Sequence, residues 1–523
     1  MNGAESLVGT LAGGGVAACF ANPGTSEMHI VAALDREKRM RCVLGLFEGV
    51  VTGAADGYAR MAGKPACTLL HLGPGLANGS ANLHNASRAH TPIVNIVGQH
   101  ARGHLHFDTP LKSDIEGIAR PYADWLRTSS DSVALGRDAA EAMATARALP
   151  GGIATLIVPA DVAWGDGGVV AEAPELRAAR ATDARAVTRA AAMLRSRVPT
   201  CLLLSGNALL GSGLAAAGQI VAATGAKLLA PYPFARMGRG GGAPVVERIP
   251  YIFEQAAGLL KEFRQMILVG AEIPRSYFAH PVKESVPVAA GCEVFTLASP
   301  GEDYASALIA LAAELGLREG ATDSRGALAD SGSRRVERPE TPRGAISIAG
   351  LAVAVGVVLP DDAIVVDESM TSGRGLMDAT ARVGPHDWLA NTGGSIGIAM
   401  PLAVGAAVAC PERRVLCLSA DGSGMYTMQA LWTMAREGLN VTVVVYANRV
   451  YGVLKREFSG LGIGEPGEKA LSMFEIGRPD LDWVNLARGM GVPGTRAGSL
   501  EEFVTALRAG FTGAGPSLIQ VDT

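Results

Sequence analysis

Short runs of β-branched and other apolar residues alternate along the whole chain with longer stretches rich in Ala and Leu. Buried parallel strands are almost continuously apolar, and the helix after each strand returns the chain to the same end of the sheet. The pattern therefore predicts repeated strand–helix–strand units and parallel sheets. The predicted strands are residues 16–20, 66–71, 93–97, 153–158, 200–204, 226–229, 266–269, 363–366, 414–418, 441–446 and 517–521.

Two segments interrupt this alternation. Residues 165–182 mix Gly, Ala and charged residues, and residues 318–344 are polar, contain Pro and lack any period, as is typical of linkers. A chain of 523 residues is long enough for about three domains. We therefore predict an α/β protein with three doubly wound parallel-sheet domains at residues 1–165, 183–317 and 345–523, and a linker at 318–344.

Composition narrows the possible partners and the compartment. The 46 Lys and Arg residues are balanced by 50 Asp and Glu residues, so no positive excess exists to hold a nucleic acid or an anionic membrane surface. No uncharged apolar run reaches the length of a membrane span, and the first residues lack the basic flank of a signal peptide. Seven cysteines without a C-x-x-C spacing favour a reducing compartment. We expect a soluble cytoplasmic protein.

The clearest chemical pattern lies in the last third of the chain. The predicted strand 414–418 runs into Ser-Ala-Asp-Gly-Ser-Gly, and strand 441–446 ends at Ala-Asn-Arg-Val-Tyr-Gly, so that Asp421 and Asn448 each follow a strand. The carboxyl ends of parallel strands meet at one edge of a sheet, where ligands usually bind. A carboxylate, an amide oxygen and a backbone carbonyl suit Mg²⁺, which takes further ligands from phosphate oxygens. The alternative is an ordinary strand-to-helix turn.

This pattern resembles the motif of thiamine-diphosphate enzymes that begins with Gly-Asp-Gly and ends in Asn. Ala420 stands in place of the first Gly, and Ala447 and Arg449 replace the usual Asn and Gly on either side of the metal-binding Asn. The substitution at Ala420 should be harmless if that residue has a negative φ. The resemblance implies the following ligands: Asp421, Asn448 and the Val450 carbonyl for Mg²⁺, and Gly422, Ser423 and Tyr451 for the cofactor.

A second segment, residues 47–60, resembles the helix that binds the aminopyrimidine ring in the same family. There a Glu at the start of the helix bonds N1′ of the cofactor and promotes loss of the thiazolium C2 proton, and Glu48 is the matching residue. Taken alone, Glu48 would be read as a solvated residue near the positive end of a helix dipole. The resemblance makes it the expected acid–base residue.

Two further loops match the family. In residues 391–401 the Gly394 carbonyl would accept a hydrogen bond from the cofactor's 4′-amino group, and Ile396 would hold the cofactor bent; simple close packing is the alternative. Residues 368–372 match the other loop on the diphosphate side, through Met370 or Thr371. The middle third resembles the central domain that binds FAD in acetohydroxyacid synthases, but we expect no FAD. Residues 238–242, Gly-Arg-Gly-Gly-Gly, are interpreted as a flexible surface loop.

The first third resembles both benzoylformate decarboxylase and acetolactate synthase. Thr25, after Asn-Pro-Gly, matches the decarboxylase hydroxyl that contacts the substrate carboxylate, and His71, at a strand end, matches its proton-transferring His. His280 is matched to a second catalytic His only by loose spacing. A purely structural hydrogen-bonding role is the alternative for His71. His100, His104 and His106 are expected to line the substrate channel, with a zinc site as the less favoured reading.

These residues predict an enzyme that uses thiamine diphosphate and Mg²⁺ to decarboxylate a 2-oxo acid. Acetolactate-synthase-like transfer of the activated aldehyde to a second carbonyl is favoured, with benzoylformate-decarboxylase-like release of an aldehyde as the runner-up. A catalytically silent paralogue that binds cofactor is the alternative from another class. The resemblance also implies a homodimer or a dimer of dimers, because in this family Glu48 and Asp421 would grip one cofactor from different subunits. The sequence does not identify the 2-oxo acid.

Overall fold

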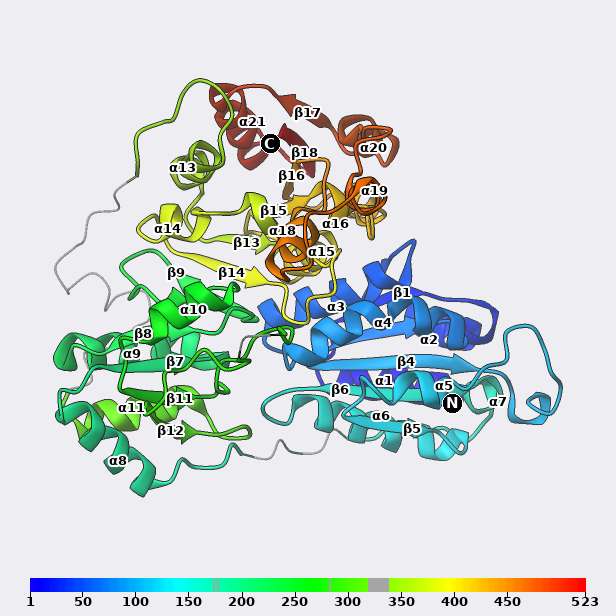
Figure 1. The fold of residues 1–523 in the computed structure, drawn as a ribbon. Coiled ribbons are helices and arrows are strands. Elements are labelled where there is room, and N and C mark those ends of the chain that lie inside the picture. Colours follow the sequence, from blue (N-terminus) through cyan, green and yellow to red (C-terminus); the bar gives the residue numbers. More distant parts are fainter. Residues whose placement is uncertain (173–174, 176–177, 282–283, 318–337) are drawn as a thin grey trace.

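The computed structural model describes residues 1–172, 175, 178–281, 284–317 and 338–523, and it contains three sheets in three bodies (Figure 1). Every strand that the hydrophobic pattern predicted is present, with ends shifted by at most two residues. Three sheets built almost wholly of parallel strands confirm the predicted fold class. Most of the predicted linker, residues 318–337, lies outside the described residues, and the domain boundaries remain predictions.

The first sheet has six parallel strands in the order β2-β1-β3-β4-β6-β5. Its strands are β1 (Ala18–Asn22), β2 (Arg41–Leu44), β3 (Ala66–Leu70), β4 (Ile93–Gln99), β5 (Trp125–Thr128) and β6 (Ile153–Pro159). Its helices are α1 (Gly3–Gly13), α2 (Met28–Arg36), α3 (Glu48–Ala62), α4 (Leu72–Arg88), α5 (Ile115–Ala119), α6 (Ser132–Arg147) and α7 (Ala160–Trp164).

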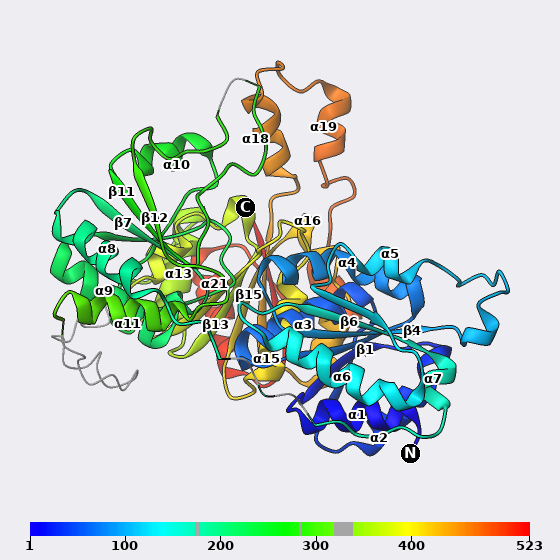
Figure 2. The same cartoon turned by 90° about the horizontal axis from the view of Figure 1, so that it is seen from below.

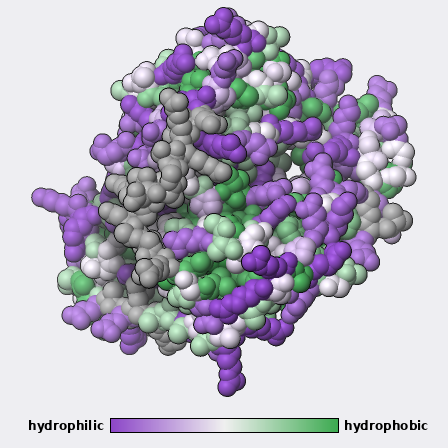
Figure 3. Space-filling view, turned by 90° about the vertical axis from the view of Figure 1, so that its left-hand side faces the viewer, coloured by the Kyte–Doolittle hydropathy of each residue, from purple (hydrophilic) through white to green (hydrophobic). Residues whose placement is uncertain are grey.

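The second sheet has five parallel strands in the order β10-β8-β7-β11-β12. Its strands are β7 (Thr200–Leu204), β8 (Lys227–Ala230), β10 (Glu247–Arg248), β11 (Gln265–Val269) and β12 (Glu293–Ala298). Its helices are α8 (Ala184–Arg195), α9 (Gly211–Thr224), α10 (Phe253–Leu260) and α11 (Tyr304–Glu314). The side of the molecule that carries α9 and α11 is mostly hydrophilic at its outline, with hydrophobic side chains gathered nearer its middle (Figure 3).

The third sheet has the order β17-β18-β16-β15-β13-β14-β9 and is parallel except at β9. Its strands are β9 (Arg236–Arg239), β13 (Ala363–Asp367), β14 (His386–Ala390), β15 (Val415–Ala420), β16 (Val441–Ala447), β17 (Gly494–Ala497) and β18 (Ser517–Asp522). Its helices are α13 (Ile348–Val358), α14 (Leu376–Thr380), α15 (Ala399–Ala409), α16 (Asp421–Gly424), α17 (Ala430–Glu437), α18 (Gly452–Gly460), α19 (Glu468–Phe474), α20 (Trp483–Gly489) and α21 (Leu500–Thr512). Among the described residues, no helix is long and apolar enough to cross a membrane.

The interpretation of residues 238–242 as a flexible surface loop is wrong at its start. Strand β9, which ends at Arg239, leaves the second domain and pairs antiparallel with β14 at the edge of the third sheet. Arg239 is buried, and its guanidinium lies 5.5 Å from the Trp388 ring centroid, within the range of a cation–π contact. Gly240 has φ +65°, and a Cβ there would lie 2.2 Å from the Gly384 carbonyl oxygen, so the glycine permits close packing.

Helix α3 packs tightly against α15 and thereby joins the first and third domains (Figure 2). Small residues make this approach possible. A Cβ at Gly57 would lie 2.0 Å from the Leu402 carbonyl oxygen, and one at Gly405 would lie 1.9 Å from the Ala54 carbonyl oxygen. The Gly-rich helix 47–60 is therefore buried on nearly all sides, and only its first turn, with Glu48, reaches an open edge.

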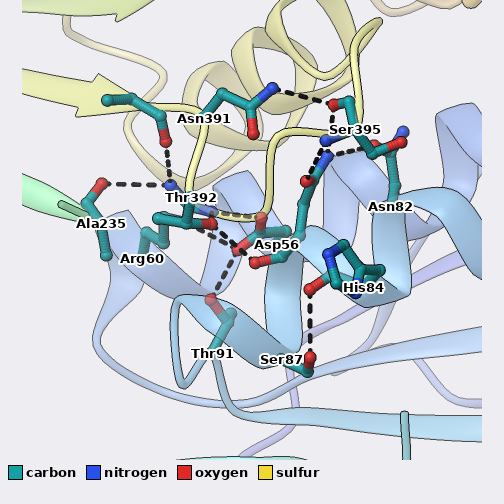
Figure 4. Close-up of polar contacts among 12 residues, drawn as sticks. Asp56, Arg60, Asn82, His84, Ser87, Thr91, Ala235, Asn391, Thr392 and Ser395 are labelled. Atoms are coloured by element: carbon teal, nitrogen blue, oxygen red, sulfur yellow. Dashed lines mark hydrogen bonds and ion pairs between the residues drawn. The ribbon is translucent and has the colours of Figure 1, made fainter. Parts of the chain in front are cut away.

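A buried ion pair on α3 ties the three domains together (Figure 4). Arg60 Nη2 lies 2.6 Å from Asp56 Oδ2, and both side chains are almost fully buried. Arg60 also donates to the carbonyl oxygens of Ala235 and Ala390, which belong to the second and third domains. Thr91 Oγ1 donates to Asp56 Oδ1 at 2.6 Å. A buried charge pair that is fully hydrogen-bonded fixes how these segments sit, because loss of any partner leaves a charge poorly solvated.

Thr91→Val should lower the free energy of unfolding by about 2 kcal/mol, because valine keeps the shape but removes the hydroxyl donor to the Asp56 carboxylate. Urea denaturation of the variant would measure the loss. Thr495→Val, at an exposed position on β17, is the matched control and should change stability by less than about 0.5 kcal/mol. Equal stability of Thr91→Val and wild type would contradict the role given to this hydrogen bond.

Candidate active site

The predicted metal ligands meet at the carboxyl edge of the third sheet. Strands β13, β15 and β16 are neighbours there, Asp421 begins α16 after β15, and Asn448 follows β16. Asp421 Oδ2 accepts the Arg449 backbone N–H at 2.6 Å, and Oδ1 accepts the Gly422 N–H at 2.9 Å. Burial raises the pKa of Asp421, and these backbone hydrogen bonds oppose the rise. A nearby cation would stabilise this buried carboxylate.

Asn448 connects the metal loop to the loop after β13. Its amide donates to Thr371 Oγ1 at 3.3 Å, and its Oδ1 accepts the Val450 N–H at 3.1 Å. Met370, beside Thr371, has φ +51° and is exposed. The site thus combines a buried carboxylate with an amide oxygen and a hydroxyl, hard oxygen donors of the kind that fit Mg²⁺ bound to a diphosphate.

The backbone explains the departures from the family motif. Ala420 has φ −103°, so no glycine is needed there. Arg449 has φ +58°, a conformation in which glycine is favoured, and this chain holds the strained residue through ion pairs to Asp480 at 2.8 Å and Asp522 at 3.0 Å. Gly422 is required for space, because a Cβ there would lie 2.5 Å from the Tyr451 ring. Ser423 is buried in the same turn.

Glu368 is a site residue that the sequence analysis quoted only as the start of a loop. Its buried carboxylate accepts the N–H groups of Gly397 and Ala399 at 3.0 and 3.1 Å and the Asn391 amide at 3.2 Å. Burial raises the pKa of Glu368 to about 7, although these hydrogen bonds act in the opposite direction. The carboxylate fixes the turn that follows Ile396. The Ile396 side chain itself is partly exposed. In the sequence, the position of this acidic residue directly after an apolar strand is the feature that could have indicated its role.

Helix α4 of the first domain holds the loop that carries Gly394 through hydrogen bonds (Figure 4). The Asn85 amide donates to the Ser395 carbonyl at 2.8 Å, and its Oδ1 accepts the Ser395 N–H at 3.2 Å. His84 Nε2 lies 3.1 Å from the Gly393 carbonyl oxygen. Gly394 itself is exposed with φ +80°. These contacts hold the loop in place and leave its tip open.

A second set of polar residues lies at the carboxyl edge of the first sheet. Glu48 begins α3, as predicted, and its Oε2 accepts the Asn78 amide at 3.0 Å. A Cβ at Gly75 would lie 3.3 Å from Glu48 Oε1, so the glycine gives the carboxyl group room. Glu48 is partly exposed at this edge and is therefore accessible to a ligand.

His71 is held by an acid that the sequence analysis missed as a site residue. Its Nδ1 lies 2.8 Å from Glu27 Oε2, and Glu27 is fully buried. Ser26 Oγ donates to the other Glu27 oxygen at 2.7 Å, and the Gly24 N–H donates to Oε2 at 2.7 Å. Glu27 lies in the turn after β1 and His71 directly follows β3, which pairs with β1; Thr25, in the same turn as Glu27, is exposed. A Glu directly after Asn-Pro-Gly-Thr-Ser was the signal for this partner.

His100 is the member of the three clustered histidines whose environment changes its pKa. Burial lowers the pKa of His100, the charges of His104 and His71 lower it further, and Glu27 acts in the opposite direction. Among the described residues, no three His, Cys, Asp or Glu side chains are placed to hold a metal ion. His280 lies elsewhere: its Nε2 is 3.1 Å from the Gly460 carbonyl at the end of α18, on the side of the third domain.

Within one chain these two sets of residues contact different turns of α4. Glu48 lies beside Gly75 and accepts a hydrogen bond from Asn78, whereas Gly393 packs beside Asn85. Asn85 is seven residues beyond Asn78 and ten beyond Gly75, which corresponds to about 10 to 15 Å along the helix axis.

Comparison with known proteins identifies the class. Residues 1–119 match the family model "Thiamine pyrophosphate enzyme, N-terminal TPP binding domain", and residues 374–521 match "Thiamine pyrophosphate enzyme, C-terminal TPP binding domain". The chain belongs to the thiamine pyrophosphate enzyme family, whose members include decarboxylases and carboligases.

Within the family, the chain is 50% identical over 523 residues to a protein of Mycobacterium tuberculosis named "Putative acetolactate synthase large subunit IlvX", covering 100% of this chain and 99% of the relative. It is 28% identical to benzoylformate decarboxylase of Pseudomonas aeruginosa, over 97% of this chain and 96% of that protein. The solved structure of a thiamine-diphosphate-dependent 4-hydroxybenzoylformate decarboxylase from Rhodococcus jostii shares the fold, with a TM-score of 0.84, 24% identity, and coverage of 100% of this chain and 99% of that one.

Proposed function

We propose that this chain uses thiamine diphosphate and Mg²⁺ to decarboxylate a 2-oxo acid. The observation that carries the proposal is the convergence of Asp421, Asn448 and Val450 at one sheet edge, in a chain of the thiamine pyrophosphate enzyme family. These residues would hold Mg²⁺, and Gly422, Ser423, Tyr451, Met370 and Thr371 would surround the diphosphate. When bound, the cofactor supplies a carbanion equivalent at C2 that adds to the keto carbon and stabilises the electrons left by CO₂.

The first domain would supply the acid–base groups. Glu48, at an open helix start, would bond N1′ of the aminopyrimidine, and the Gly394 carbonyl and Ile396 would hold the ring from the other side. Thr25 would face the substrate carboxylate. Asn78 donates to Glu48 and orients its carboxyl group without competing for its second oxygen.

The geometry favours release of an aldehyde over transfer to a second carbonyl. Glu27 is buried 2.8 Å from His71 Nδ1, so Nδ1–H donates to the carboxylate and Nε2 stays available on the other side of the ring. A carboxylate behind an imidazole fixes the orientation of the ring, so that Nε2 is held toward the site for proton transfer. Protonation of the reacting carbon completes a simple decarboxylation, the benzoylformate-decarboxylase-like reaction.

Acetolactate-synthase-like carboligation, which the sequence placed first, is the second candidate. The 50% identity to a relative with an acetolactate synthase name favours it. Product analysis with pyruvate and with benzoylformate separates the two. Benzaldehyde without a ligated product would support the decarboxylase, and acetolactate would support the carboligase. Absence of CO₂ release from every 2-oxo acid in a broad panel would contradict both.

We also propose that the site is shared between two copies of the chain. Glu48 and the Gly394 loop of one chain contact α4 at positions seven to ten residues apart, and a two-fold partner can bring its Glu48 to the Gly394 and Asp421 of the first copy. Two equivalent sites then form from one self-complementary surface.

Mixing Glu48→Gln chains with Asp421→Ala chains should restore activity in mixed dimers, because one of the two sites then combines a wild-type Glu48 with a wild-type Asp421. Up to half of the wild-type activity per mixed dimer is expected, measured after purification with two different affinity tags. Full activity in a monomer by sedimentation, or no recovery in verified mixed dimers, would refute the shared site.

A further inference from the structure

Three tyrosines form a cluster at the carboxyl edge of the second sheet. Tyr232 follows β8, Tyr251 precedes α10, and Tyr277 follows β11. Their ring centroids lie 5.2 to 5.8 Å apart in tilted and edge-to-face arrangements. Burial raises the pKa of all three hydroxyls, so the rings stay neutral. The carboxyl edge of a doubly wound sheet is where ligands of such folds bind.

Two arginines without a counter-charge adjoin this tyrosine cluster. The Arg248 guanidinium lies 4.9 Å from the Tyr232 ring centroid. Arg456, on α18 of the third domain, is partly buried, and its Nε is fully buried without a hydrogen-bond partner. In the part of the chain that the structure describes, neither guanidinium makes an ion pair or a hydrogen bond. The negative charges of Glu457 and Asp367 act on Tyr251 and Tyr232, and Asp367 accepts hydrogen bonds from the Ser369 N–H and hydroxyl.

Partly buried arginines usually have an anionic partner, because a guanidinium loses hydration on burial and regains it only through hydrogen bonds. The charge of Arg456 acts on the hydroxyls of both Tyr232 and Tyr251, and the charge of Arg248 acts on Tyr232 and Tyr277. Both positive charges therefore act on the same group of rings. The cluster combines apolar aromatic rings with two guanidiniums whose N–H groups make no hydrogen bond within the described residues.

The cluster borders the cofactor half of the site. A Cβ at Gly394 would lie 3.8 Å from Tyr277 Cε1, so Tyr277 is the side chain nearest to the tip of the Gly394 loop. Helix α18, which carries Arg456, begins at Gly452, where a Cβ would lie 3.2 Å from Thr371 Oγ1. A molecule that reacts beside Gly394 and Thr371 would extend its far end over the tyrosines.

We propose that Arg248 and Arg456, above the tyrosine cluster, bind a second carboxylate at the far end of the substrate's side chain, so that the enzyme prefers dicarboxylic 2-oxo acids. This assignment rests on the proposed 2-oxo acid chemistry. The reacting carboxylate would face Thr25 of the partner copy, the tyrosine rings would pack against the side-chain methylenes, and the two guanidiniums would hold the distal carboxylate through paired N–H groups.

The test uses the enzyme loaded with thiamine diphosphate and Mg²⁺. Glutarate and butyrate, which lack a keto group, report binding without reaction, and calorimetry should show glutarate binding about 10-fold or more tightly than butyrate. Arg456→Gln and Arg248→Gln should each weaken glutarate binding by about 10- to 100-fold and leave butyrate binding unchanged. Arg185→Gln, at an exposed arginine on α8, is the matched control and should change neither.

Turnover of 2-oxoglutarate against 2-oxobutyrate provides the second readout. The two site variants should raise KM for 2-oxoglutarate with little change in kcat, because they touch only the distal carboxylate. Equal binding of glutarate and butyrate, or glutarate binding that neither variant weakens, would overturn the assignment. So would arginine-dependent binding of inorganic phosphate or ADP tighter than glutarate, which would make the ligand a phosphate compound.

The failure of this inference and the failure of the proposed function give different results. Arginine-dependent glutarate binding without CO₂ release from any 2-oxo acid would preserve the carboxylate site and refute the proposed reaction. Decarboxylation of monocarboxylic 2-oxo acids with no preference for dicarboxylic ones would preserve the reaction and refute the site. Circular dichroism of both variants identifies a fold defect, and the two arginines lie in different domains, so a defect in one leaves the other as a test.

Discussion

Asp421→Ala chains should purify without thiamine diphosphate under conditions in which wild-type chains retain it. The Asp421 carboxylate is buried and accepts the Gly422 and Arg449 N–H groups, at the edge where Asn448 Oδ1 accepts the Val450 N–H. In the proposed site Mg²⁺ would neutralise the diphosphate beside these residues, and without it the negatively charged phosphate groups would be uncompensated. Apparent cofactor affinity should fall by about 10²-fold or more, the scale of several kcal/mol that a bound metal ion contributes.

Cofactor content after gel filtration, measured by absorbance and mass spectrometry, checks this result. Glu412→Ala, at an exposed acidic position in the same domain, removes the same charge far from the ligands and should retain the cofactor. Copurification of stoichiometric thiamine diphosphate with Asp421→Ala would show that the metal assignment is wrong.

Glu48→Gln should reduce turnover by about 10² or more while the fold and much of the cofactor affinity remain. Glutamine can still accept the Asn78 amide hydrogen bond, so the start of α3 keeps its structure. It cannot exchange a proton with N1′, and loss of a positioned acid–base group typically has this cost. Steady-state rates across the pH range, together with cofactor titration, would measure both parts of the prediction.

Asn78→Ala is the matched comparison for Glu48→Gln. It removes the hydrogen-bond donor to Glu48 but keeps the carboxyl group, so turnover should fall much less than in Glu48→Gln. Turnover of Glu48→Gln equal to that of wild type at every pH would eliminate the role given to Glu48.

The sequence was most informative where local pattern and topology coincide. Apolar runs predicted the strands, and the rule that parallel strands end at one edge predicted that Asp421 and Asn448 lie close together. Strand β9 was not predictable, because only its pairing with β14 of another domain makes residues 236–239 a strand.

The buried acids show a second limit. Glu27 and Glu368 look like ordinary surface carboxylates in the sequence, and their roles depend on which backbone amides and side chains surround them in the fold. The loop after β11 shows a third limit. Its conformation places Tyr277 beside Gly394 and His280 beside Gly460, and residue spacing does not encode such a conformation. The catalytic role of His280 stays a prediction.

We infer that this chain activates thiamine diphosphate, which a silent cofactor-binding paralogue would not do. The rate of hydrogen–deuterium exchange at C2 of the bound cofactor, measured by acid quench and proton NMR without any substrate, distinguishes the two. We expect exchange on the order of 10² times faster or more than in free thiamine diphosphate, with most of the acceleration lost in Glu48→Gln. Exchange of the bound cofactor at the rate of the free cofactor would show that the chain does not activate it.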